Sequence, residues 1–492
     1  MNVLFITADQ WRGDCLSTLG HPAVRTPHLD RLAADGVLFA RHFGQATPCG
    51  PSRASLLTGM YAMNHRSITN GTPLDARHRT LADLASTAGY DPVLFGYTDT
   101  SIDPRTVPPD DPRLLSYEGV ASGFRPVLKI AEPEEPYLEF LEANGYGRMT
   151  YEEVYGGDID RPAPFRAEHS VTAFLADRFL EWLEPQGREP WFAHVSFLKP
   201  HPPFVAPTPW FESVDRSLVP PPRRAPSVDA EGEMHPWLRA HLARREKALT
   251  GPRETALAGD RLRELRAIYY GLVGEVDHHL GRIFDQLARR GEFDRTLIVF
   301  TADHGEMLGD HWMIGKSGFF LQAFHVPLIV RHPEGVRGRR VEAFSEHVDL
   351  MPTMLEAIGV RVPLQCDGRA LTPFLRGEEP ARWRGAVHYE HDFRDPVKRS
   401  YETSLGVESD SCGIAVRYDG RLAYVHFAGL QPLAFDTEAD PDWLTNIAGE
   451  PSRAPEILRA AQGMLSWRME AAERRLTGCQ LTPDGVVGAY DV

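Results

Sequence analysis

Short apolar runs alternate with segments of helical periodicity along most of this chain. The runs typical of buried strands cover residues 3–7, 92–95, 191–197, 296–301 and 326–331. The segments with helical periodicity cover residues 26–35, 52–58, 80–88, 262–290 and 349–358. The first of these helices would open with Thr26 as its cap and Pro27 at the first helical position. Alternation of this kind is typical of sheets layered with helices, so the sequence predicts an α/β fold.

The last quarter of the chain follows a different pattern. Residues 386–393 and 412–427 alternate apolar and polar side chains, and a helix covers 454–475. A chain of 492 residues exceeds the roughly 250–300 residues that a single core usually reaches. We therefore expect a catalytic α/β domain over residues 1–375 and a smaller α+β subdomain with an antiparallel sheet over 376–492.

Two stretches, residues 103–155 and 206–252, are rich in proline, glycine and charged side chains and have weak periodicity. The proline run at 220–222 cannot join a central strand, because proline has no amide hydrogen to donate. We interpret both stretches as insertions over the active face, where loops carry specificity.

Charge and composition exclude several classes of partner. The formal net charge is −15, whereas phosphate contacts need clustered Lys and Arg, so we expect no nucleic acid. No apolar run approaches the roughly 20 residues that span a bilayer, so we expect no membrane contact. The five cysteines are widely spaced without a C-x-x-C pair, and the first residues lack the pattern of a secretory signal. A cytoplasmic location is the resulting expectation.

Acidic side chains follow two of the predicted strands. Asp9 ends the first strand, and Asp303-His304 ends the strand over 296–301. A single Asp at such a place is more often a helix cap. Ligands of open α/β sheets bind at the carboxyl ends of strands, however, and carboxylate oxygens suit Ca²⁺, Mg²⁺ or Mn²⁺. Two such ends in one chain indicate a metal site.

The most specific motif runs from Pro48 to Gly59 and reads Pro-Cys-Gly-Pro-Ser-Arg-Ala-Ser-Leu-Leu-Thr-Gly. A lone cysteine beside a proline is usually structural, but the whole motif resembles the sulfatase signature. This resemblance implies that Cys49 is oxidised to formylglycine (3-oxoalanine). The hydrated aldehyde offers two hydroxyls: one attacks the ester centre, and deprotonation of the other re-forms the aldehyde and expels the bound group. Arg53 would hold this diol and add positive charge.

Membership of the alkaline-phosphatase superfamily is also implied by the strand that ends in Asp-His-Gly. The resemblance implies an alkaline-phosphatase-like sandwich with a large mixed sheet. It also implies one divalent ion, Mn²⁺ or Ca²⁺, held by Asp9, Gln10, residue 49, Asp303 and His304. Sulfatases usually carry a second Asp where this chain has Gln10. The ligand set is therefore less negatively charged in this chain.

Two further basic residues are assigned by the same resemblance. His201 lies in the run Lys-Pro-His-Pro-Pro over residues 199–203, where the family places a histidine that reaches the substrate. A histidine held between prolines is rigidly aimed, which suits an acid or a charge clamp. Lys316, in Gly-Lys, resembles the lysine that contacts the transferred group. Without the resemblance, both residues would be interpreted as ordinary loop side chains.

One stretch departs from typical sulfatases, which carry Gly-Lys-x-His after the strand that follows the signature. Here residues 96–99 read Gly-Tyr-Thr-Asp, so Tyr97 and Asp99 replace two cationic side chains. This resembles the branch of phosphonate monoester hydrolases and phosphodiesterases, which has tyrosine at the first place and commonly threonine at the second. Further resemblances to that branch lie at residues 63–70, 387–395, 424–428 and 465–468.

Asp99 also differs from the threonine that is common in this branch, and two hypotheses account for the presence of a carboxylate at this position. It could pair with Arg105 and leave the charge of the site unchanged. Alternatively, it could take the proton from the second diol hydroxyl when the covalent intermediate breaks down.

The resemblance thus implies a metal-dependent formylglycine hydrolase that cleaves phosphonate monoesters and phosphate diesters and, more weakly, sulfate esters. Charge developing on the substrate would be stabilised by Arg53, Asn70, Tyr97 and Lys316, and His201 or Lys316 would protonate the leaving oxygen. The expected partners are a small anionic ester, a formylglycine-generating enzyme and further copies of this chain.

Three rival functions remain. An arylsulfatase would need cationic side chains at positions 97 and 99. A member that binds anions without catalysis would be expected to lack Cys49, Asp303 or His304, and the chain has all three. A phosphomutase or phosphatase of the superfamily would use Ser or Thr as nucleophile and a second metal site.

Overall fold

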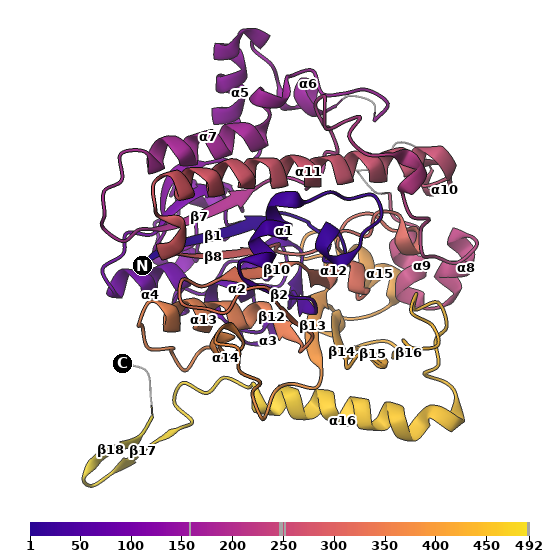
Figure 1. Cartoon of the computed structure of the whole chain (residues 1–492). Helices are drawn as coiled ribbons and strands as arrows, with labels where there is room; N and C mark the ends of the chain where they lie inside the picture. Colours follow the sequence, from indigo (N-terminus) through magenta and orange to yellow (C-terminus); the bar gives the residue numbers. More distant parts are fainter. Residues whose placement is uncertain (157–158, 246–248, 250–251, 490–492) are drawn as a thin grey trace.

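A computed structural model describes residues 1–156, 159–245, 249 and 252–489 (Figure 1). Among these residues, the largest sheet has eight strands in the order β11-β2-β10-β8-β1-β7-β5-β6. Its strands are β1 Asn2–Ala8, β2 Val37–Phe39, β5 Val93–Gly96, β6 Arg125–Lys129, β7 Phe192–Phe197, β8 Thr296–Thr301, β10 Leu328–Arg331 and β11 Arg339–Val341. The centre of the sheet is parallel, with β1 between β7 and β8, whereas β10 runs antiparallel to β8 and β2.

Side chains of β1 alternate between two cores, one on each face of this sheet. Leu4 and Ile6 belong to the core that includes α1 Pro27–Ala34, α7 Val171–Leu183 and α11 Gly259–Arg289. Val3 and Phe5 belong to the core that includes α2 Cys49–Thr58, α4 Leu81–Thr87, α13 Leu350–Ala357 and α14 Thr372–Leu375. The chain is therefore a sandwich of helices around a mixed sheet, as the sequence predicts.

The C-terminal part forms a second sheet in the order β16-β15-β14-β13-β4. It contains β13 Val387–Asp392, β14 Gly413–Tyr418, β15 Leu422–Phe427 and β16 Leu433–Asp436, which are antiparallel to one another. Its last strand is β4 Ala46–Thr47, which comes from the signature region and pairs parallel to β13. Helix α16 Ala454–Glu470 packs on this sheet (Figure 1). The division of the chain at residue 375 stays a prediction.

The remaining elements connect these layers. A small sheet joins β3 His42–Phe43, β9 His325–Val326 and β12 Ser345–Glu346. The short helices are α3 Ala62–His65, α5 Glu135–Leu141, α6 Tyr151–Tyr155, α8 Val228–Glu233, α9 Pro236–Leu242, α10 Arg253–Ala256, α12 Leu321–Phe324 and α15 Ser400–Leu405. The hairpin of β17 Cys479–Thr482 and β18 Gly485–Gly488 extends away from the body (Figure 1). None of the described helices combines the length and the apolar character that crossing a bilayer requires.

Three local predictions differ from the structure. The strand predicted over 326–331 is divided into β9 and β10, because Pro327 between them has no amide hydrogen. The side chain of Thr26 makes no capping hydrogen bond to α1, although Thr26 is at the cap position. Strand β6 lies inside the segment interpreted as an insertion; it tolerates Pro126 because it is the edge strand.

Candidate active site

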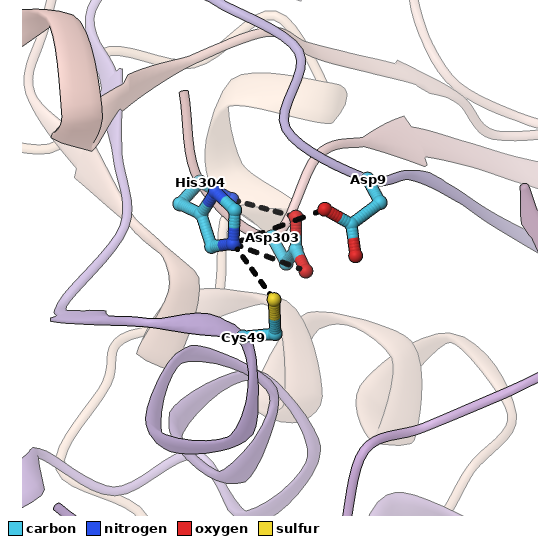
Figure 2. Close-up of side chains that lie close together, drawn as sticks. All are labelled: Asp9, Cys49, Asp303 and His304. Atoms are coloured by element: carbon cyan, nitrogen blue, oxygen red, sulfur yellow. Dashed lines mark hydrogen bonds and ion pairs between the residues drawn. The ribbon is translucent and has the colours of Figure 1, made fainter. Parts of the chain in front are cut away.

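Four side chains that are distant in the sequence meet at the carboxyl ends of β1 and β8 (Figure 2). Asp9 directly follows β1, Asp303 and His304 follow β8, and Cys49 is the first residue of α2. One potential ligand atom of each lies within 4.8 Å of the others. The Nε2 atom of His304 is 3.2 Å from Cys49 Sγ, 3.9 Å from Asp9 Oδ1 and 3.7 Å from Asp303 Oδ2. All four residues are buried.

The donor atoms of this group fit a divalent cation. The Nδ1 atom of His304 is 3.1 Å from the carbonyl oxygen of Gly305, so Nδ1 carries the hydrogen and Nε2 keeps its lone pair. Asp9 Oδ1 is buried and has no hydrogen-bond partner among the described residues. A buried carboxylate oxygen without a partner is costly unless something binds it. Carboxylate and imidazole donors at this spacing suit ions such as Ca²⁺ or Mn²⁺.

Arg53, one helical turn after Cys49, holds the two carboxylates in place. Its Nε donates to Asp303 Oδ2 at 2.9 Å, and its Nη2 donates to Asp9 Oδ2 at 3.1 Å. Its Nη1 donates to the carbonyl oxygen of Tyr97 and to Ser196 Oγ. Burial alone would lower the pKa of Arg53, but the carboxylates, Asp303 first, raise it well above its ordinary value. The predicted contact of Arg53 with a diol at position 49 stays a prediction.

Cys49 is the first residue of α2, and Asn70 contacts the backbone beside it. The amide nitrogen of Gly50 donates to Asn70 Oδ1 at 2.9 Å, so Asn70 binds one of the free amides of the helix. Burial, and then the charge of Asp9, raises the pKa of the Cys49 thiol well above its ordinary value. Because the thiolate is the nucleophilic form of cysteine, these surroundings disfavour the reactive form of an unmodified Cys49.

A chain of hydrogen bonds connects Lys316 to the base of the site. Its Nζ donates to Gln10 Oε1 at 2.7 Å, and Gln10 Nε2 donates to the carboxylate of Glu306. Glu306 also accepts hydrogen bonds from the backbone amides of Leu308 and Gly315, and burial raises its pKa to about 7. The amide oxygen of Gln10 is thus bound to Lys316, and its role as a metal ligand stays a prediction.

Tyr97 makes a hydrogen bond to one of the four residues of the proposed metal site. Its hydroxyl donates to Asp9 Oδ2, and the guanidinium of Arg53 lies 4.3 Å from the centre of its ring. Tyr97 therefore orients Asp9 while presenting its ring and no positive charge to the site.

Asp99 lies beside Tyr97 with backbone φ of 53°, in the left-handed region. Its predicted pairing with Arg105 is wrong, because Arg105 binds Asp103 at 2.6 Å and Asp75 at 2.9 Å. The Oδ1 atom of Asp99 is buried and has no hydrogen-bond partner among the described residues. Burial is the main cause that raises the pKa of Asp99 to about 7.

His201 is fixed by its neighbours. Its Nδ1 lies 2.6 Å from the carbonyl oxygen of Pro202, which leaves Nε2 as the acceptor of a neutral ring. Burial lowers the pKa of His201 to about 3. Lys199 holds the loop by donating from Nζ to the carbonyl oxygens of His201 and Pro203, at 3.0 and 2.8 Å.

A pocket of about 100 Å³ opens onto this group. The predicted catalytic residues that line it are Cys49, Asn70, Tyr97, Asp99, His201 and Lys316. The segment 103–155 supplies further lining residues, as predicted, whereas the described part of 206–252 supplies none. A larger cavity of about 440 Å³ lies between the C-terminal sheet and α16, and none of the predicted site residues lines it.

Sequence reasoning missed several residues of this site. Lys199 and Glu306 lie inside the motifs at residues 199–203 and 303–306, so their place in these motifs could have identified them as site residues. Tyr117, Glu118 and Tyr151 come from the insertion over 103–155, where no motif distinguishes them from other polar side chains.

Comparison with known proteins agrees with this geometry. The chain matches the sulfatase family model over residues 1–360, and a model named N-sulphoglucosamine sulphohydrolase, C-terminal, over residues 309–469. The chain belongs to the sulfatase family.

Individual relatives are similar over the whole length. The multifunctional alkaline phosphatase superfamily protein PehA of Trinickia caryophylli is 40% identical, covering 99% of this chain and 98% of its own. The phosphonate monoester hydrolase of Agrobacterium radiobacter is 45% identical over the whole of both chains, with a TM-score of 0.96. The phosphonate monoester hydrolase of Silicibacter pomeroyi is 40% identical over the whole of both chains, with a TM-score of 0.94.

Proposed function

We propose that this sulfatase-family hydrolase cleaves phosphonate monoesters and phosphate diesters, with weaker cleavage of sulfate esters. The observation that carries the proposal is the pair Tyr97 and Asp99, which line the pocket beside Cys49 and bring no positive charge to it. Relatives at 40–45% identity that are named phosphonate monoester hydrolases support the same substrate class.

The metal ion and the modified residue belong to the proposal. Asp9, Asp303, His304 and residue 49 would hold one divalent ion. When present, the ion would polarise the ester oxygen, and formylglycine at position 49 would supply a hydroxyl nucleophile in place of the thiol. Both Mn²⁺ and Ca²⁺ accept this donor set.

The chain's own residues divide the remaining tasks. Arg53 fixes the orientation of Asp9 and Asp303 by donating to both. Lys316 is charged: burial alone would lower its pKa, but Cys49 and the carboxylates raise it well above its ordinary value. An ammonium group in the pocket stabilises charge that develops on the substrate and can protonate the leaving oxygen.

His201 is the less suitable proton donor. Its ring is neutral because its pKa is lowered to about 3, and its one ring hydrogen is directed at the carbonyl oxygen of Pro202. Its Nε2 can therefore accept a hydrogen bond or a proton, and Lys316 remains as the donor to the leaving group.

An activity panel tests the proposal. Four 4-nitrophenyl esters share one leaving group: a phosphate diester, a phosphonate monoester, a sulfate and a phosphate monoester. We expect kcat/KM in the order diester ≈ phosphonate monoester > sulfate > phosphate monoester, since the dianionic monoester suffers most from a site with Asp99. Chelation should abolish all four activities, and one divalent ion per chain should restore them.

A tenfold preference for the sulfate over the diester, about 1.4 kcal/mol in the barrier, would favour an arylsulfatase instead. Two ions per chain about 4 Å apart would favour a phosphatase or mutase. Protein with Cys49→Ala, prepared in parallel, controls for contaminating phosphatases.

Three further expectations belong to this proposal: maturation by a formylglycine-generating enzyme, assembly of several copies of the chain, and a cytoplasmic location. The exposed side chains of Leu481 and Val487 on the C-terminal hairpin are compatible with contacts between copies. Each of the three stays a prediction.

A further inference from the structure

Two phenols and two carboxylates are among the residues that line the active-site pocket: Tyr117, Glu118, Glu132 and Tyr151. Tyr117 and Glu132 are exposed and Glu118 and Tyr151 are half-buried, whereas Cys49, Tyr97 and Asp99 are buried. All four come from the segment 103–155, so this segment determines what the outer part of a bound substrate meets. We call these four residues the pocket mouth.

The cations in the pocket do not neutralise this mouth. Lys316 donates to Gln10 at the base of the site. Lys199 donates to the carbonyl oxygens of His201 and Pro203 and is a neighbour of Glu134. The ammonium groups that line the pocket are thus committed to its interior.

The carboxylates of the mouth lie close to one another. The backbone amide of Glu132 donates to the Glu118 carboxylate at 2.5 Å, so the two residues are held together. Burial, and then the charge of Glu132, raises the pKa of Glu118 above its ordinary value. Lys129, which lowers that pKa, is exposed and does not line the pocket.

Asp99 extends this acidic surface inward. It is 4% exposed, it lines the same pocket, and it is close enough to Glu118 for the two charges to interact. Because Arg105 is bound elsewhere, Asp99 Oδ1 has no partner among the described residues. A buried carboxylate oxygen without a partner, on a residue that lines the same pocket as Glu118 and Glu132, indicates a site for positive charge.

We propose that the substrate carries a cationic alkylammonium substituent, which lies between the phenols and carboxylates of the pocket mouth while the anionic ester group lies at Cys49; this inference rests on the proposed function. The faces of tyrosine rings attract an alkylammonium group, and the carboxylates of Glu118 and Glu132 attract its charge. A neutral substituent of the same shape would bury the same apolar surface without these interactions.

A matched pair of diesters separates charge from shape. The first is 4-nitrophenyl phosphocholine, and the second is 4-nitrophenyl 3,3-dimethylbutyl phosphate, in which a carbon atom replaces the charged nitrogen. Both release 4-nitrophenol, so one assay of the metal-loaded, mature enzyme measures both. We expect kcat/KM to favour the choline ester at least tenfold, and we expect the ratio to fall as salt is added because the mouth is partly exposed.

Variants locate the effect. Glu118→Gln and Glu132→Gln together should bring the ratio of the two kcat/KM values close to one. Glu152→Gln is the matched control: it removes an exposed carboxylate of the same segment that does not line the pocket, so the ratio should keep its original value.

The outcomes distinguish this inference from the proposed function. Equal cleavage of both diesters, or a preference that survives in the double variant, would overturn the inference and leave the phosphodiesterase proposal standing. Cleavage of neither diester would overturn the proposed function and this inference with it.

Discussion

Cys49 shows how the surroundings of a single residue restrict its chemistry. It is 3% exposed and close to the carboxylate of Asp9, and both factors favour the protonated thiol. A thiol in that form is a weak nucleophile. The same position suits a neutral group such as an aldehyde or its hydrate, which carries no charge to be disfavoured by burial.

Peptide mass spectrometry should therefore find formylglycine at position 49 in active protein. Cys49→Ala should remove most of the activity, with kcat/KM lowered by about a thousandfold or more, as is typical of a lost nucleophile. The specific activity of different preparations should increase with the modified fraction. Equal turnover by wholly unmodified protein would contradict the mechanism.

The pair Tyr97 and Asp99 is expected to select between ester classes. Tyr97→Lys combined with Asp99→His should raise sulfatase activity relative to diesterase activity, because two cationic side chains then face the sulfate. The measurement is the ratio of kcat/KM values for 4-nitrophenyl sulfate and a 4-nitrophenyl diester. Tyr97→Phe with Asp99→Asn, which adds no positive charge, is the control, and an equal rise in that variant would count against the electrostatic explanation.

Most residues of the active site could be predicted individually from sequence motifs. Asp9, Cys49, Asp303 and His304 each follow a recognisable pattern, and the structure brings them together. The surroundings of Asp99 could not be predicted, because nothing in the sequence showed that Arg105 is bound to Asp75.

The helix α1 is fixed by a residue of another helix. The carboxylate of Asp277, on α11, accepts from the backbone amides of His28 and Leu29 at 3.1 and 2.8 Å. Those amides belong to the first turn of α1, where Thr26 supplies no side-chain cap. A distant residue thus replaces the local cap that the sequence predicts.

Asp277→Ala should lower the free energy of unfolding by about 2 kcal/mol, because two amides of a helix N-terminus lose their acceptor. Hydrogen exchange should show lower protection in α1 in particular. The control is Asp285→Ala, on the same helix, which removes a half-exposed ion pair to Arg31 and should cost at most about 0.5 kcal/mol. Similar losses in both variants would argue against the capping role.

Elements with a continuous apolar pattern could be predicted from the sequence, and those defined by a distant partner could not. The strands β1, β7 and β8 and the helix α11 lie within a few residues of their predicted bounds. In contrast, β4 has two residues and is a strand only because β13 lies beside it.

The molecule as a whole contains acidic side chains that burial holds in the neutral form. Glu275 of α11 is 1% exposed, and burial raises its pKa from 4.5 to about 7, although Ser170 and Lys199 lower it. The unfolded chain releases this proton near pH 4.5, whereas the folded chain keeps it up to about pH 7. The stabilising contribution is therefore lost as the pH rises through this window, by about 3 kcal/mol at most.

Glu275→Gln should remove this contribution. Relative to the wild type, the variant should gain stability between about pH 4.5 and pH 7 and level off above that, measured as the difference in Tm at each pH. Taking the difference cancels the opposite effect of the buried histidines, which both proteins share. Asp285→Asn, a half-exposed change on the same helix, is the control, and parallel behaviour of the two variants would refute the assignment.

The pairing of β4 with β13 also has a consequence for the order of events during synthesis. Residues 46–47 are separated from Cys49 by one residue, and they pair with a strand that begins at residue 387. In the folded chain Cys49 is 3% exposed and lines a pocket of about 100 Å³, which is too small to admit another protein. An enzyme that oxidises this cysteine is therefore expected to act before the chain has folded around residue 49, and the pairing with β13 makes that fold depend on the last hundred or so residues.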